Sequence, residues 1–262
     1  MQLVTRNNRF NLLFMPFLFL AVTLSSCGGS NGDQDSPSPQ VNTANESTAV
    51  VRYKQYSRSD IVDMVKQIDS PSEKSGGLAL QSLPSHPGHF IDEPEIAAEV
   101  IIPALIRIMN DSRHPTFQGL AATKLMGMGE FGKPAIPALI EAMKDSALRP
   151  FICHGISDMG VIGDAAIPTL ATMLEASEAQ VQIDACRGLT RFAERGASTL
   201  PQLCQLLESD SVIVQVAAVL ALGSMKSYGK PALNALAPLL ESKSDSVRFA
   251  ARRSMKKIKS EK

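Results

Sequence analysis

The chain repeats one short apolar phrase at nearly constant intervals. A leucine follows a proline by two residues in IIPALIRIM, AIPALIEAM, AIPTLATML and TLPQLCQLL, and ALNALAPLL continues the series without the proline. The five leucines, which are 34, 31, 33 and 33 residues apart, are Leu105, Leu139, Leu170, Leu203 and Leu236. A period in this range is the signature of stacked repeats, each of which buries its apolar face against its neighbours. The sequence therefore predicts an array of similar units.

Each unit predicts two helices. The first, the A helix, has its proline in the first turn and apolar residues three before, three after and four after the leucine, which form one helical stripe. The second, the B helix, spans 117–128, 151–162, 181–192, 214–225 and 247–258 in the five units. It is apolar at offsets 8 and 11 from the first residue of each range. A small residue stands at offset 4 in every copy, where it lets a neighbouring helix approach: Ala121, Gly155, Ala185, Ala218 and Ala251.

Three further features refine this pattern. A glycine precedes each of the last four leucines by seven residues, at Gly132, Gly163, Gly196 and Gly229. We expect it to supply a permissive backbone at the joint between units. Asn234 and Pro238 predict a bent or late A helix in the last unit. A weaker copy with an N-cap at Ser59 and Asp60 makes about six units, and residues 84–95 are inserted after it as an irregular loop.

The proline-led A helix, the small residue in the B helix and the joint glycine resemble HEAT repeats, especially the compact kind found in phycobilisome lyases. The resemblance covers roughly residues 58 to 260 and implies an all-α solenoid of about six HEAT-like helix hairpins. A tetratricopeptide array has a similar period, but it lacks a proline near the start of its first helix and needs large aromatic residues that are missing here.

The N-terminus indicates export. Arg6 and Arg9 precede the apolar run Leu12 to Leu24, which has the length of a signal-peptide core and is short for a membrane span. The following LSSC resembles the lipobox of bacterial lipoproteins, which implies removal of residues 1–26 and lipid attachment at Cys27. Residues 27–48 are the lipidated cysteine and a flexible linker, and residues 49–262 are the repeat domain. We expect a lipid-anchored protein of the bacterial cell envelope, with the outer membrane favoured because Gly28 follows the cysteine.

Composition limits the partner. The 26 basic residues are balanced by 26 acidic ones, and tryptophan is absent, so neither charge nor aromatic stacking predicts nucleic acid as a partner. We expect the chain to be attached to the membrane through the lipid and to bind a protein partner, whose identity the sequence does not give.

The B helices of HEAT solenoids usually line the concave face, so polar residues at offsets 3, 6 and 10 are expected to face a partner. The candidate partner-binding residues are Asp184, Arg187, Arg191, Arg253 and Lys257. They make this face more basic than the whole molecule. The basic segment Lys243 to Lys262 is interpreted either as a polar cap on the last repeat or as a surface for an anionic partner.

Other chemistry has weaker support. We predict no catalytic residue, no cofactor and no metal. One alternative is a metal-responsive binder that uses the 86–95 loop, where His86 and His89 lie near three acidic residues. The other is a HEAT-repeat enzyme or lyase-like subunit. Two states are possible for the remaining cysteines, Cys153, Cys186 and Cys204: one disulfide, or three buried thiols. The main hypothesis is a membrane-tethered scaffold without catalytic activity, which binds a protein along the concave face.

Overall fold

The computed structural model describes residues 56–68, 73–86, 89, 95–111 and 113–260. The chain divides into two units, Met1–Ser38 and Pro39–Lys262, and every described residue belongs to the second. The predicted signal peptide, Cys27 and the linker to residue 48 lie outside the described residues.

The described residues of this unit form six helix hairpins, as the repeat pattern predicts. The A helices are α1 (Arg58–Ile68), α3 (Ile102–Met109), α5 (Ile136–Ala142), α7 (Ile167–Leu174), α9 (Leu200–Gln205) and α11 (Leu233–Leu236). The B helices are α2 (Glu73–Ser82), α4 (Pro115–Gly127), α6 (Arg149–Gly155), α8 (Ala179–Phe192), α10 (Val212–Ser224) and α12 (Asp245–Ser260). Shorter helical segments join or extend them: η2 (Ala97–Ile101, π-helical) and the 3-10 segments η3 (Gly129–Ala135), η4 (Ile156–Ala166), η5 (Ala193–Thr199), η6 (Leu206–Glu208), η7 (Lys226–Ala232) and η8 (Ala237–Glu241).

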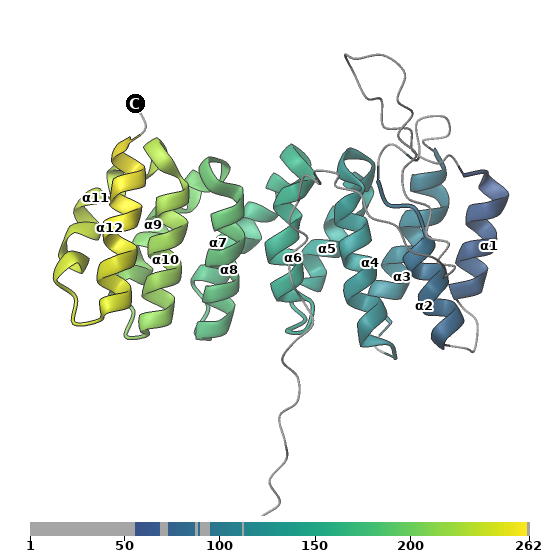
Figure 1. Cartoon of the computed structure of the whole chain (residues 1–262), viewed down its shortest axis with the longest axis horizontal. Coiled ribbons are helices and arrows are strands. Elements are labelled where there is room, and N and C mark those ends of the chain that lie inside the picture. Colours follow the sequence, from purple (N-terminus) through teal and green to yellow (C-terminus); the bar gives the residue numbers. More distant parts are fainter. Residues whose placement is uncertain (1–55, 69–72, 87–88, 90–94, 112, 261–262) are drawn as a thin grey trace, which may run out of the picture. The chain divides into compact units, whose positions relative to one another are not determined.

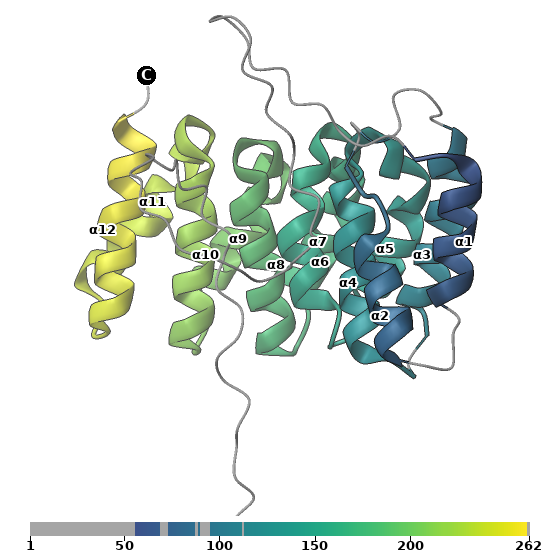
Figure 2. The same ribbon diagram turned by 45° about the vertical axis from the view of Figure 1, so that its right-hand side comes forward.

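The hairpins stack in one row. Each B helix packs beside the next, from α2 through α4, α6, α8 and α10 to α12, and each A helix packs on the B helix of its own repeat. Figure 1 shows the B helices side by side from α2 to α12, and the turned view of Figure 2 shows the A helices as a second layer. The all-α solenoid predicted from the sequence is therefore confirmed.

One continuous apolar core runs through the array from Ile61 to Ile258. The five repeat leucines are 0% exposed, and so are the four alanines at offset 4 of the B helices. Gly155 holds this position in α6, where an added Cβ atom would lie 2.8 Å from the Cε atom of Met126 on α4. The small residue thus allows neighbouring B helices to approach closely, as predicted.

The prolines begin the A helices as expected. Pro103, Pro137, Pro168 and Pro201 occupy the first turn of α3, α5, α7 and α9. In the last repeat α11 ends at Leu236 after only four residues, and the 3-10 segment η8 follows with Pro238 in its first turn. The deviation predicted from Asn234 and Pro238 is therefore confirmed.

The reason predicted for the joint glycines is wrong. None of Gly132, Gly163, Gly196 and Gly229 has a positive φ; among the described residues, positive φ occurs three positions earlier, at Gly129, Gly160, Ala193 and Lys226. At Gly132, Gly163 and Gly229 glycine is needed instead for close approach: at Gly163 an added Cβ atom would lie 2.2 Å from the backbone oxygen of Ile156. Glycine is required there by space and not by φ.

The third repeat departs from the predicted stripe. Phe151, expected at the start of a buried stripe, is 49% exposed, whereas Ile152 and Ile156 are 0% exposed. The α-helix α6 ends at Gly155, and η4 continues it with the tighter 3-10 winding. The change of winding keeps Met159 in the core but turns Phe151 outward.

Candidate protein-binding face

Equivalent side chains of the last three B helices form rows. Successive repeats are 33 residues apart here, so Arg187, Leu220 and Arg253 occupy the same place on α8, α10 and α12. One helical turn further, the equivalent residues are Arg191, Ser224 and Lys257. Because α10 packs against both α8 and α12, these rows cross three adjoining helices. We call the surface formed by these two rows, together with the exposed residues of α10 between α8 and α12, the B face.

Four cations stand on the two outer helices of the B face. The Arg187 side chain is 64% exposed, and its Nη1 atom lies 3.9 Å from Oδ1 of Asp184. Arg191 donates from Nη2 to Oδ1 of Asp158 at 3.0 Å, and both of these side chains are about half exposed. Arg253 and Lys257 are exposed and form no ion pair with any acidic residue that the structure describes.

Asp184 does not lie on the surface as the other candidates do. Its side chain is 1% exposed, and Oδ1 accepts a hydrogen bond from Nε2 of Gln180 at 2.9 Å. The charge of Asp184 also contributes to a raised pKa of the Cys153 thiol on α6, so the carboxylate faces the joint between α6 and α8. In this position Asp184 supports the α8 surface from beneath and does not present itself to a partner.

An apolar ridge on α10 separates the two cationic helices. Ile213 is 64% exposed and Leu220 is 41% exposed, and they are seven residues apart on one side of the helix. Only polar residues were predicted at the outward offsets, so the sequence pattern did not predict this ridge. The repeat register held the signal, because Leu220 stands where α8 and α12 both carry arginine.

The three thiols have no disulfide partner, and none is placed for reactivity. Burial raises the pKa of Cys153 and of Cys186 to about 12, and it also raises the pKa of Cys204. A nucleophilic cysteine needs a lowered pKa and access to solvent. These thiols therefore act as small apolar residues of the core.

Among the described residues, no three His, Cys, Asp or Glu side chains are placed to hold a metal ion together. In the inserted loop the rings of His86 and His89 meet edge to face with centroids 6.3 Å apart, and the His89 ring lies 5.7 Å from that of Tyr56. Asp92 and Glu93 of the same loop lie outside the described residues, so the metal-responsive alternative stays a prediction.

Cys27, the predicted lipid site, lies outside the described residues. Of the helices in the described part of the chain, none is long and apolar enough to cross a membrane.

These features define a class of protein. Stacked helix hairpins with a shared core and an exposed row of second helices form an α-solenoid of the HEAT or armadillo type. Residues 167–256, which run from α7 into α12, match the model of the HEAT repeat family. No curated protein matches the sequence significantly.

Solved structures agree on the fold. The chain is similar to a designed armadillo repeat protein in complex with the peptide (KR)4, with 18% identity, 76% of this chain and 99% of that chain covered, and a TM-score of 0.52. An engineered protein has 19% identity, coverage of 77% and 99%, and a TM-score of 0.50. The complex of CpcE and CpcF of phycocyanin lyase from Nostoc sp. PCC7120 has 23% identity, coverage of 61% and 65%, and a TM-score of 0.49.

Proposed function

We propose that the chain is a membrane-tethered scaffold that binds an acidic segment of a protein partner along the B face. The observation that carries this proposal is the exposed ridge of Ile213 and Leu220 between the cations of α8 and α12. An apolar strip with charged flanks is the arrangement by which grooves hold amphipathic segments of other proteins.

The ridge and the cations have different tasks. Burying the exposed aliphatic surface contributes roughly 25 cal/mol for each Å² removed from water, so Ile213 and Leu220 provide binding energy. Exposed ion pairs contribute only about 0 to 1 kcal/mol each. Arg187, Arg253 and Lys257 therefore mainly select the sign of the partner's charge and speed its approach.

Several observations support binding without catalysis. The exposed residues in the two rows of the B face are one leucine and four cations, and Ser224 donates its hydroxyl to the backbone oxygen of Ala221 at 2.6 Å. The thiols of Cys153 and Cys186 are buried, and their burial raises the pKa, which opposes nucleophilic attack. A geometric function, in which the rigid array holds its partner in place, is the one that such a surface performs.

The tether is the second part of the proposal, and it rests on the sequence of residues 1–27. The basic start, the apolar run and LSSC support lipidation of Cys27, which would place the array on the bacterial cell envelope. In cells that process lipoproteins, Cys27→Ser is expected to move the protein from the membrane to the soluble fraction. Unchanged membrane association of this variant would contradict the tether.

The binding proposal is tested with two labelled peptides of equal length. Both carry leucines seven residues apart; the first has glutamates between them, and the second has lysines. We expect the acidic peptide to bind and the basic one not to bind, which is the opposite sign from the (KR)4 peptide in the complex of the designed armadillo repeat protein. Leu220→Asp should weaken binding of the acidic peptide at least tenfold, or about 1.4 kcal/mol.

The matched control is Lys133→Glu, which reverses an exposed charge in η3, outside the B face. It should leave the affinity of the acidic peptide unchanged. Equal binding of both peptides, or an equal loss in Leu220→Asp and Lys133→Glu, would show that the B face does not select its partner.

A further inference from the structure

From α2 to α10, each B helix is covered on one side by the next B helix. At Gly188 on α8 an added Cβ atom would lie 2.7 Å from the backbone oxygen of Cys153 on α6, so offset 2 of one helix faces offset 7 of the next. Cys153 is 1% exposed, and the equivalent Ile183 on α8 is 7% exposed. The equivalent on α12 is Phe249, which is 70% exposed because no described helix packs on its far side.

The open side of α12 combines apolar and basic groups. Phe249 stands about one helical turn before Arg252 on α12. Arg252 belongs to a hollow lined by Leu240, Arg252, Met255, Lys256, Lys259 and Ser260. Leu240 and Met255 are partly buried against the core and give the hollow an apolar floor. The three cations form its rim. End repeats normally present a polar outer face, so an exposed phenylalanine departs from a simple cap.

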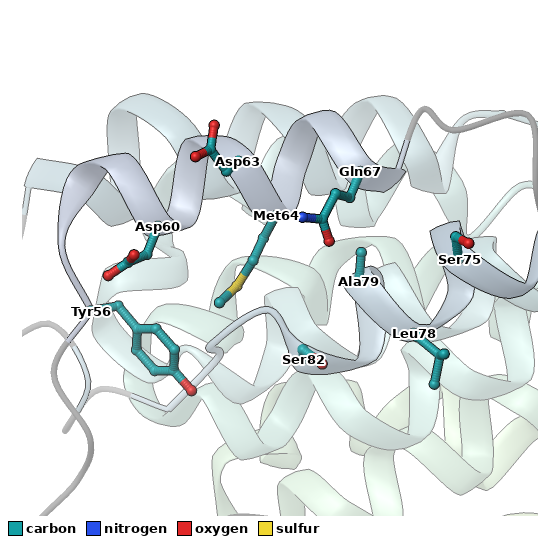
Figure 3. Close-up of a pocket in the computed structure, with 9 residues that line it drawn as sticks. All are labelled: Tyr56, Asp60, Asp63, Met64, Gln67, Ser75, Leu78, Ala79 and Ser82. Atoms are coloured by element: carbon teal, nitrogen blue, oxygen red, sulfur yellow. The ribbon is translucent and has the colours of Figure 1, made fainter.

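The first repeat has an open side of opposite sign. A hollow of about 600 Å³ lies between α1 and α2, and Asp60, Asp63, Met64 and Leu78 are among its lining residues. Figure 3 shows Met64 and Leu78 on its walls and the two carboxylates on the α1 side. Leu78 is 56% exposed. Ala250 has the same offset on α12, but it is only 4% exposed because α10 packs beside it, and no described helix takes the corresponding place beside α2.

We propose that a second copy of this chain docks here, with the open side of α12 in one copy placed against the α1–α2 hollow of the other. Phe249 enters the hollow between Met64 and Leu78, where a methionine sulfur and an aromatic ring attract each other. Arg252, Lys256 and Lys259 then face the acidic side of α1. Asp63 is paired with Lys66 at 3.1 Å, but its side chain is 65% exposed and open to a second cation.

The proposed joint continues the register of the array, because α12 of one copy takes the place before α2 of the next that each B helix takes within a copy. Such a contact joins two different surfaces, so it leads to chains or closed rings instead of a symmetric dimer. Its charged part is exposed to solvent and weakens as salt rises. This inference is independent of the partner proposed for the B face.

Two blocked variants of the full chain test the joint. Leu78→Lys places a cation in the hollow and repels the basic rim, and Phe249→Ser removes the projecting ring. Sedimentation velocity is measured from about 1 to 100 µM, where weak contacts assemble. A mild detergent is present so that the apolar residues 12–24 do not themselves drive association. The natural chain is expected to form larger species as its concentration rises. Each variant alone should have an association constant at least tenfold lower.

Mixing the two variants gives the decisive result, because each retains the surface that the other lacks. The mixture should form a one-to-one dimer that grows no further. Phe151→Ser, which removes a half-exposed phenylalanine in the middle of the array, is the control and should associate like the natural chain. Circular dichroism checks that every variant is folded. A natural chain that stays monomeric throughout, or a mixture without dimer, would overturn the proposal.

Discussion

Ala193 is held in a backbone conformation that suits glycine. It ends α8 with φ 52° and ψ −124°, a region in which a side chain costs of order 1 to 3 kcal/mol. The equivalent residue one repeat earlier, Gly160, has φ 68° and ψ −143°. Replacing Ala193 by glycine removes the strain. It also gives the unfolded chain more conformational freedom, which cancels about 0.5 to 1 kcal/mol of the stabilisation. We therefore expect Ala193→Gly to stabilise the fold by about 1 kcal/mol.

Urea unfolding followed by circular dichroism measures this effect. The midpoint should rise without a change in the slope m, and the melting temperature should rise by about 2 to 4 °C. The matched control is Gly160→Ala, which adds a methyl group at the equivalent position. Nothing lies within 4 Å of the added Cβ atom there, so the backbone alone determines the result. This variant should lose about 1 kcal/mol.

The two substitutions together test whether φ at this position governs stability. If Ala193→Gly left the midpoint unchanged or lowered it, while Gly160→Ala was neutral, the strain argument would be refuted. If Ala193→Gly raised the stability while Gly160→Ala did not lower it, the effect would instead be assigned to the partly buried methyl group of Ala193.

Three further predictions concern residues of the B helices. Gly188→Ala should destabilise the fold by about 1 to 3 kcal/mol, because the new methyl group meets the backbone of Cys153, and denaturant midpoints measure the loss. Gly119→Ala on α4 should instead gain about 0.5 to 1 kcal/mol, since nothing lies within 4 Å of its added Cβ atom; equal effects in both variants would contradict the packing argument. Lys124 is 9% exposed and donates from Nζ to the backbone oxygens of residues 81 and 83, at 2.9 and 2.6 Å, and burial lowers its pKa from 10.5 to about 8. The unfolded state therefore binds more protons between about pH 8 and 10.5, so Lys124 makes stability rise with pH in that window. The buried thiols have the opposite effect on stability above pH 9, so the natural chain is compared with Lys124→Met, which retains the thiols. The difference in unfolding free energy between the two proteins should grow with pH. A constant difference would refute the lowered pKa of Lys124.

The repeat pattern predicted the architecture because a constant period constrains every unit at once. The repeat leucines, the small residues and the short A helix of the last repeat all follow from apolar spacing and proline chemistry. The exposure of Phe151 was not predicted, because a change from α to 3-10 winding inside a repeat changes which side of the helix is buried, and the sequence gives no clear signal of this change. Ala193 and Lys226 were missed for a similar reason: positive φ is usually marked by glycine, and neither residue is one.

The candidate site was predicted less completely than the fold. Arg187, Arg191, Arg253 and Lys257 are exposed, since their offsets lie away from the core stripe. Asp184 has an equally outward offset, but α6 approaches α8 on that side and covers it. Helical periodicity gives direction around one helix, whereas burial also depends on how closely the neighbouring helix packs.

Photo-crosslinking in living cells tests the central claim most directly. A photoreactive residue replaces Leu220 on the B face or, as the control, the exposed Thr172 on α7. We expect one discrete protein adduct from position 220, no such adduct from position 172, and loss of the adduct when Arg187 and Arg253 are both changed to glutamate. The same adduct from both positions, or an adduct that survives the charge reversal, would contradict binding of an acidic partner on the B face.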